Sequence, residues 1–204
     1  MFAQVNVPYN AGTTAFLLGC CMLVPECMNG DLDHQVEKWA KSGKVGEKPK
    51  FKWFRWPNQH WIAFWAAIIE LFGAILFCIG SAASAAQTNI ASFPEWAEWA
   101  FIIVPYFVGG LAFTIGGYMF IREETTAWYE GILPLSQEDL VHLEFWINSL
   151  NFWGGMGFLL SGAFGFDTSI QPWLLDTELA VGYVGGSSLF MIASYLMVLE
   201  LMNP

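Results

Sequence analysis

The sequence predicts an all-α fold: a polytopic membrane protein whose five transmembrane helices form a bundle built from repeated helix pairs. Three observations support this prediction: the scarcity of charge, five long apolar runs, and a pattern of small residues that recurs in each run. Hydrophobic residues make up 55% of the chain and charged residues only 13%, whereas soluble domains contain about 25% charged residues. We therefore expect residues 1–204 to form a single domain embedded in the lipid bilayer.

The five apolar runs are the candidate transmembrane helices. They cover residues 8–25, 59–85, 97–121, 142–166 and 179–202. Because a helix needs about 20 apolar residues to span a bilayer, the first run, which ends before Glu26, is the weakest candidate. A polar loop, residues 29–57, joins the first two runs, and its Gly and Pro residues would leave it flexible on its own.

The basic residues predict how the chain is oriented in the membrane. Seven of the eight Lys and Arg residues lie in the 29–57 loop, and the eighth, Arg122, follows the third run, which five helices would place on the same side. The loops near residues 86–96 and 167–178 contain no Lys or Arg. Since basic loops stay on the cytoplasmic side of a membrane, we expect the C-terminus in the cytoplasm or stroma. The N-terminus is then expected in the lumen or outside.

Each run contains a phenylalanine with small residues on both sides. The phenylalanines are Phe16, Phe77, Phe113, Phe158 and Phe190. Four residues before them lie Gly12, Gly73, Gly109, Gly154 and Gly186, and three residues after them lie Gly19, Gly80, Gly116, Ser161 and Ala193. Small residues seven apart lie on one helix face, and transmembrane helices associate by close packing at such faces. We therefore predict that these glycines are helix-packing residues, with a hinge role as the alternative.

Alternate runs share further residues, which makes the repeating unit a pair of helices. The second and fourth runs align at a constant offset that pairs Glu70 with Asn151. The third and fifth runs pair Tyr106 with Tyr183, and the first run joins them through Tyr9. The sequence thus contains two full pairs and a leading half, and the partner helix expected before Tyr9 is either lost from the protein or trimmed from this sequence.

This paired pattern resembles a family of small integral membrane proteins of bacteria, fungi and algae that includes the YrhK-like proteins. The segments that carry the resemblance are Trp53-Phe54-Arg55-Trp56-Pro57, before the second run, and Gly73-Ala74-Ile75-Leu76-Phe77, within it. The resemblance covers most of the chain after residue 50. It implies a helical membrane protein, and it implies no catalytic residues because the family offers no established reaction.

Glu70 is the most unusual residue of the apolar runs because it lies near the middle of the second run. A charged residue at the bilayer centre costs about 3 kcal/mol or more, so we expect Glu70 to face protein and to have a partner, or to be neutral. The equivalent positions in the other runs hold Asn151, Tyr106, Tyr183 and Tyr9. We predict that these residues form a buried polar cluster. Structural hydrogen bonding, a proton or cation relay, and a ligand site are three interpretations of it.

Four further polar residues lie near the starts of the second and fourth runs. They are His60, His142, Glu144 and Asn148. The simpler interpretation is that they are interfacial residues at helix ends. Imidazole, carboxylate and amide groups can also ligate the magnesium of chlorophyll, so a bound chlorophyll or carotenoid is the alternative. Bound lipid is expected in either case.

The sequence argues against several other classes of protein. No GxSxG, HExxH, P-loop or GxGxxG motif lies on a suitable element, so we do not expect an enzyme. The four cysteines lack metal-ligand spacing, so no metal site is expected. The net charge of -10 argues against a nucleic-acid partner.

The leading functional hypothesis is a non-catalytic accessory or scaffold subunit that packs against other membrane protein subunits. An energy-transducing membrane such as the thylakoid is the compartment we expect. The alternative is a small proton- or cation-coupled transporter or channel that uses Glu70. A dry bundle favours the first hypothesis, and a polar path from Glu70 to both faces of the membrane favours the second.

Overall fold

The computed structural model describes residues 2–54, 61–89, 93–125, 127–135, 141–166 and 172–202, apart from the side chains of residues 2–6, 172, 174–180 and 201. Within these residues the chain is all-helical and contains no strand, which confirms the predicted all-α class. The elements are α1 (Phe2–Met28), α2 (Leu32–Lys41), α3 (Ile62–Gln87), α4 (Glu95–Glu98), the π-helical turn η1 (Trp99–Ile103), α5 (Val104–Glu124), α6 (Leu143–Phe164) and α7 (Pro172–Met202).

Four segments of the described chain are long and apolar enough to cross a membrane, as expected of a multi-pass membrane protein. They are Val7–Lys41, Ile62–Gln87, Glu95–Glu124 and Val181–Glu200. α6, the remaining predicted span, has 22 residues but is not among them. Its polar residues Glu144, Asn148 and Asn151 lower its hydropathy.

The helices differ from the predicted runs mainly at their ends. α1 begins at Phe2 rather than at residue 8, and α7 begins at Pro172 rather than at residue 179. α4, η1 and α5 follow one another without a break, and the π-helical turn lies just before Pro105. Because proline cannot donate an N–H group to the helix, a change in hydrogen-bond pattern at this point is expected.

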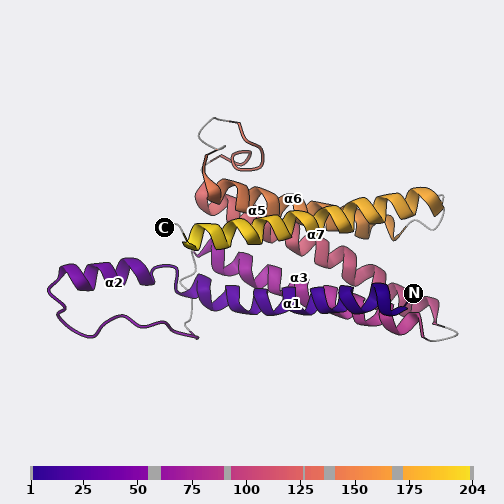
Figure 1. Cartoon of the computed structure of the whole chain (residues 1–204), viewed down its shortest axis with the longest axis horizontal. Coiled ribbons are helices and arrows are strands. Elements are labelled where there is room, and N and C mark those ends of the chain that lie inside the picture. Colours follow the sequence, from indigo (N-terminus) through magenta and orange to yellow (C-terminus); the bar gives the residue numbers. More distant parts are fainter. Residues whose placement is uncertain are drawn as a thin grey trace.

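The long helices pack in the order α1, α3, α5, α6 and α7, and each contacts its neighbour in this series (Figure 1). Two classes of helix alternate along the series. α1, α5 and α7 contain Tyr9, Tyr106 and Tyr183, and we call them the tyrosine helices. α3 and α6 contain Glu70 and Asn151 at the equivalent position, and we call them the Glu/Asn helices.

Each long helix has two stripes of small residues beside its phenylalanine. Stripe A consists of the residues four before and three after the phenylalanine, namely Gly12 and Gly19, Gly73 and Gly80, Gly109 and Gly116, Gly154 and Ser161, and Gly186 and Ala193. Stripe B lies one residue later and consists of Thr13 and Cys20, Ala74 and Ser81, Gly110 and Gly117, Gly155 and Gly162, and Ser187 and Ser194.

Stripe A joins each Glu/Asn helix to the tyrosine helix that follows it in the chain. In the α3–α5 junction, a Cβ added to Gly73 would lie 3.1 Å from the carbonyl oxygen of Gly109. In the α6–α7 junction, a Cβ added to Gly154 would lie 3.1 Å from the carbonyl oxygen of Gly186. The same residues of the pattern therefore meet in both junctions, at the same close approach.

Stripe B joins each tyrosine helix to the Glu/Asn helix that follows it. In the α5–α6 junction, a Cβ added to Gly110 would lie 2.6 Å from the backbone nitrogen of Leu159, so the two backbones touch. In the α1–α3 junction, hydroxyl groups occupy the stripe, and Oγ1 of Thr13 donates a hydrogen bond to Oγ of Ser81 at 3.4 Å. The four helix junctions thus fall into two types that alternate.

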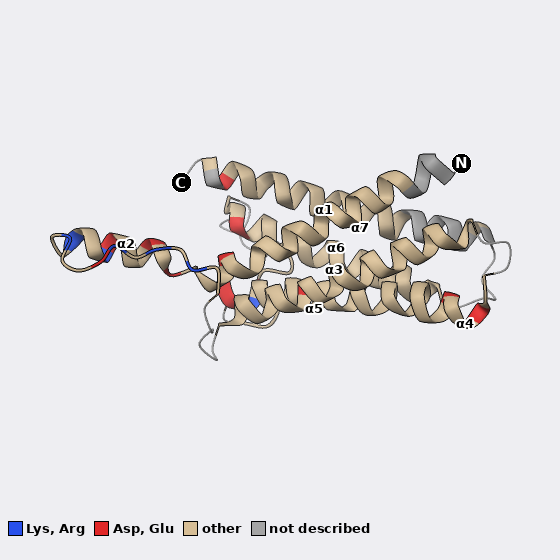
Figure 2. Cartoon of the chain, turned by 90° about the horizontal axis from the view of Figure 1, so that it is seen from below, with Lys and Arg blue, Asp and Glu red and all other residues tan. Residues whose placement is uncertain are grey.

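Residues 29–54, which we call the arm, project beyond one end of the bundle and include α2 (Figure 1). Figure 2 shows that the lysines of the described chain gather on this arm. Asn29 closes its base, because its Nδ2 donates to the carbonyl oxygen of Lys52 at 2.8 Å and its Oδ1 accepts from the Lys52 N–H at 2.9 Å. The sequence does not predict α2, and the loop expected to be flexible is thus partly helical and tied at its base.

Candidate functional site

The centre of the bundle is a layer of five phenylalanines, one from each long helix. Phe16, Phe113 and Phe190 of the tyrosine helices form a triangle whose ring centroids are 5.2, 5.2 and 5.8 Å apart. Phe77 and Phe158 of the Glu/Asn helices are 5.0 Å apart, and both contact Phe113. Phe113 is only 1% exposed. This phenylalanine layer supplies no hydrogen-bonding side chain and forms the apolar core.

The three predicted tyrosines lie together on one side of the phenylalanine layer. The ring centroids of Tyr9 and Tyr106 are 6.4 Å apart, and those of Tyr106 and Tyr183 are 5.7 Å apart. The Tyr106 ring packs against Gly80, where an added Cβ would lie 2.9 Å from it. The structure therefore brings three of the five predicted polar residues together.

Glu70 lies on the other side of the phenylalanine layer, toward the arm. Its side chain packs against Gly116, where an added Cβ would lie 2.5 Å from Cγ of Glu70. Tyr106 instead contacts Gly80, ten residues further along α3, a distance of about 15 Å along a helix. The predicted single cluster of Glu70 with the tyrosines is therefore wrong. Neighbouring helices run antiparallel, so equivalent positions in the two helix classes fall on opposite sides of the layer.

The Glu70 carboxyl group is buried without full hydrogen bonding. The residue is 6% exposed, and Oε1 has no hydrogen-bond partner among the described residues. Asn151, its counterpart on α6, flanks α5 at the adjacent glycine: a Cβ added to Gly117 would lie 3.4 Å from the carbonyl carbon of Asn151. α5 therefore lies between the two predicted partners, and Glu70 is a single buried carboxyl group.

A groove of about 810 Å³ opens between α1 and α7. Its floor is the phenylalanine layer, and its walls carry small residues of both helices. It is lined by Pro8, Tyr9, Gly12, Thr13, Ala15, Phe16, Phe77, Phe113, Phe158, Ser187, Phe190, Met191 and Ser194. The apolar lining suits an apolar occupant.

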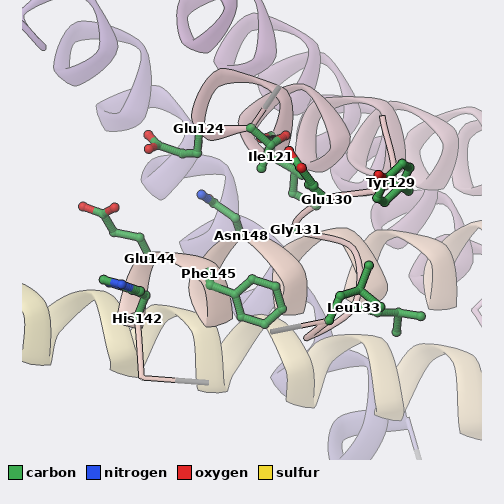
Figure 3. Close-up of a pocket in the computed structure, with 12 residues that line it drawn as sticks. Ile121, Glu124, Tyr129, Glu130, Gly131, Leu133, His142, Glu144, Phe145 and Asn148 are labelled. Atoms are coloured by element: carbon green, nitrogen blue, oxygen red, sulfur yellow. Dashed lines mark hydrogen bonds between the residues drawn. The ribbon is translucent and has the colours of Figure 1, made fainter. Parts of the chain in front are cut away.

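A second pocket, of about 470 Å³, lies at the arm end of the bundle, beside Thr125 and residues 127–135. Three of the predicted pigment ligands, His142, Glu144 and Asn148, line it, and Figure 3 shows Glu124 and Tyr129 at its other edges. The fourth predicted ligand, His60, lies outside the described residues. Within the described chain no group of three His, Cys, Asp or Glu side chains is arranged to hold a metal ion.

Hydrogen bonds from α5 and α6 hold the segment that covers this pocket. Arg122 donates to the carbonyl oxygen of Ala127 at 2.6 Å, and Tyr118 donates to that of Trp128 at 3.1 Å. Ser149 and Trp153 both donate to the carbonyl oxygen of Ile132, at 3.1 and 2.9 Å. The sequence does not predict the bonds of Ser149 and Trp153 to Ile132, because they join residues 17 and 21 positions apart.

The two cavities differ in their chemistry. The second pocket is acidic and polar along one side, where Glu124, Glu144 and Asn148 lie (Figure 3). The groove between α1 and α7 is apolar, and its walls carry the same small-residue stripes that pack together in the helix junctions elsewhere in the bundle.

Comparison with protein-family models, with curated proteins and with solved structures found no match to this chain.

Proposed function

We propose that this protein is a non-catalytic accessory subunit that packs through its helices against other subunits of a membrane assembly. In this proposal α6 crosses the membrane as a fifth span, the bundle consists of repeated helix pairs, and the arm lies on the cytoplasmic or stromal side. The groove between α1 and α7 is the observation that carries the proposal. An apolar cavity of about 810 Å³ with walls of small residues offers a large surface for close helix packing.

Native mass spectrometry of the protein extracted from its own membrane in mild detergent tests this function. We expect the chain in a complex of defined stoichiometry with other membrane proteins. An absorption spectrum of the same sample tests for a bound chlorophyll or carotenoid. A chain that is recovered alone, with lipid only, contradicts the accessory-subunit proposal.

A second candidate function is proton- or cation-coupled transport through Glu70. The buried carboxyl oxygen of Glu70, which has no hydrogen-bond partner among the described residues, favours it, because ionisable residues inside a membrane commonly mark ion or proton pathways. Glu70→Gln keeps the shape of the side chain and removes its proton. In liposomes that contain a pH-sensitive dye, the native chain should then conduct protons or couple them to a cation, and the variant should not. Equal flux through both proteins contradicts the transport hypothesis.

A further inference from the structure

We propose that the groove between α1 and α7 seats one transmembrane helix of a partner subunit, and that this helix carries stripes of small residues like those of α3 and α6. The inference rests on the proposed function, since it names the kind of partner that the accessory subunit takes. Three features of the bundle support it: the spacing of the tyrosine helices, the stripes exposed in the groove, and the alternation of helix classes.

The three tyrosine helices contribute phenylalanine rings that are nearly equally spaced. Phe16, Phe113 and Phe190 form a nearly equilateral triangle, with sides of 5.2, 5.2 and 5.8 Å. α3 fills the interval between α1 and α5, and α6 fills the interval between α5 and α7. The third interval, between α7 and α1, is equivalent at the layer of rings but holds the groove. A helix in this interval would complete a ring of six positions with approximate three-fold symmetry.

The walls of the groove are the two stripes against which no other helix of the described chain packs. Stripe A of α1 begins at Gly12, which lines the groove, and a Cβ added to Gly12 would meet nothing within 4 Å. At the equivalent positions Gly109 and Gly186, an added Cβ would collide with a Glu/Asn helix. Stripe B of α7, Ser187 and Ser194, also lines the groove. One helix of the Glu/Asn class would match both walls, with its stripe A on α1 and its stripe B on α7.

The alternation of classes argues against a second copy of this chain as the occupant. A second copy of the chain has two Glu/Asn helices, α3 and α6, and each is already flanked by a tyrosine helix on both sides. A second copy therefore has no such helix to insert. An acyl chain would fill apolar space, but it has no stripes of small residues to match those of the walls, on which close helix packing in membranes depends.

A photo-crosslinking experiment with the full chain in lipid nanodiscs tests the inference. A photoreactive residue replaces either Met191, which lines the groove and is 68% exposed, or the neighbouring Ile192, which is 44% exposed and does not line it. The probe is a peptide of residues 62–87, the sequence of α3. We expect peptide adducts from position 191 and few from position 192. Equal adduct yields, or adducts at position 191 with lipid or a second copy only, overturn the inference.

Two matched variants test whether the peptide binds in the groove between α1 and α7. Gly12→Leu places a side chain in the groove, whereas Gly185→Leu places one in open space elsewhere on α7. Gly12→Leu should weaken peptide binding about tenfold, which corresponds to 1.4 kcal/mol, and Gly185→Leu should leave it unchanged. Circular dichroism and thermal unfolding check that both variants fold. Unchanged binding by folded Gly12→Leu overturns the inference.

The same photoreactive positions, used in native membranes, separate failure of the inference from failure of the proposed function. A partner subunit that crosslinks at position 191 supports both. If native mass spectrometry detects a complex whose partner crosslinks only at position 192, that result overturns the proposed binding of a partner helix in the groove, but it leaves the accessory function standing. A chain recovered without any partner contradicts the accessory function.

Discussion

Glu70 combines burial in an apolar helix junction with a carboxyl oxygen that has no hydrogen-bond partner among the described residues. An unsatisfied buried polar group typically costs about 1–3 kcal/mol of stability. Its neighbours Gly116 and Ala66 are too small to offer a side-chain partner. Replacing the Glu70 side chain therefore shows whether its carboxyl group contributes to the stability of the protein or to its function.

We predict that Glu70→Met stabilises the protein, by about 1–3 kcal/mol, because an unbranched apolar side chain fills the same space without an unpaired oxygen. Glu70→Ala should destabilise it, because it leaves a cavity. Thermal unfolding in detergent measures both effects. A loss of stability in Glu70→Met would show that the carboxyl group forms a stabilising bond in solution.

The sequence predicted that Glu70 is buried against protein, since an exposed carboxyl group near the bilayer centre is too costly. The sequence also predicted that Glu70 and Tyr106 lie in one cluster, and this prediction was wrong. The repeat aligns positions along the sequence, whereas depth in the bundle also depends on the direction of each helix. The residues that face each other, Glu70 with Gly116 and Tyr106 with Gly80, occupy different positions of the pattern.

At the scale of elements, the helices are held together by backbone contacts that tolerate no larger residue. In the α5–α6 junction, a Cβ on Gly110 would lie 2.6 Å from a backbone atom of α6, and one on Gly155 would lie 2.7 Å from a backbone atom of α5. Backbone atoms cannot move aside as the end of a flexible side chain can. The junction must therefore open if either glycine is replaced.

We expect Gly110→Ala to destabilise the bundle by about 1–3 kcal/mol, the usual cost of overpacking a core. Gly185→Ala is the matched control, since a Cβ there meets nothing within 4 Å. It should change stability little or raise it slightly, because alanine favours helix. The midpoint of thermal unfolding in detergent measures the difference. Equal midpoints for the two variants would disprove the close α5–α6 contact.

The segment over the second pocket depends on two donors to one carbonyl oxygen. We predict that Ser149→Ala combined with Trp153→Phe loosens residues 127–135, because Ile132 loses both hydrogen bonds, each worth about 1 kcal/mol. Hydrogen–deuterium exchange should become faster in this segment. Ser188→Ala, which removes a bond within α7 only, is the control. Unchanged exchange in the double variant would mean that other contacts hold the segment.

The long helices were predictable from the sequence because their apolar runs and small-residue spacing are local patterns. α2 was not predicted because the Gly and Pro residues around it indicated a loop, although Leu32, Val36 and Trp39 recur at helical spacing. Contacts distant in sequence stabilise this region: Asn29 pairs with Lys52, and Nε1 of Trp39 donates to the carbonyl oxygen of Gly46 at 3.1 Å. The sequence also does not predict which stripe packs in which helix junction, since all of the long helices carry both stripes.

At the scale of the whole molecule, the lysines of the described chain lie at one end of the bundle, whereas acidic residues lie at both ends. The arm with its lysines and the C-terminus lie at one end, and the N-terminus lies at the other (Figure 1; Figure 2). This arrangement agrees with an odd number of crossings. From the positive-inside rule we propose that the arm is the cytoplasmic or stromal end.

A labelling experiment checks this orientation. We predict that a membrane-impermeant amine reagent modifies the arm lysines, such as Lys44 and Lys48, in inverted vesicles but not in right-side-out vesicles. The lysines are exposed and lie outside the bundle. A tag fused before Met1 should show the reverse accessibility. Labelling of the arm from both sides, or from the outer side only, would reject the proposed orientation.

The phenylalanine layer also determines from which side water could reach Glu70. The rings of Phe77, Phe113 and Phe158 meet at the bundle axis and offer no donor or acceptor to a file of water molecules, which needs polar partners at each step. They form an apolar barrier to water between Glu70, on the arm side of the layer, and the tyrosines, on the opposite side of the layer. A proton that reaches Glu70 from the arm side must return by the same route unless the rings move. Conduction through this bundle would thus require an alternating gate, whereas one-sided proton exchange would not.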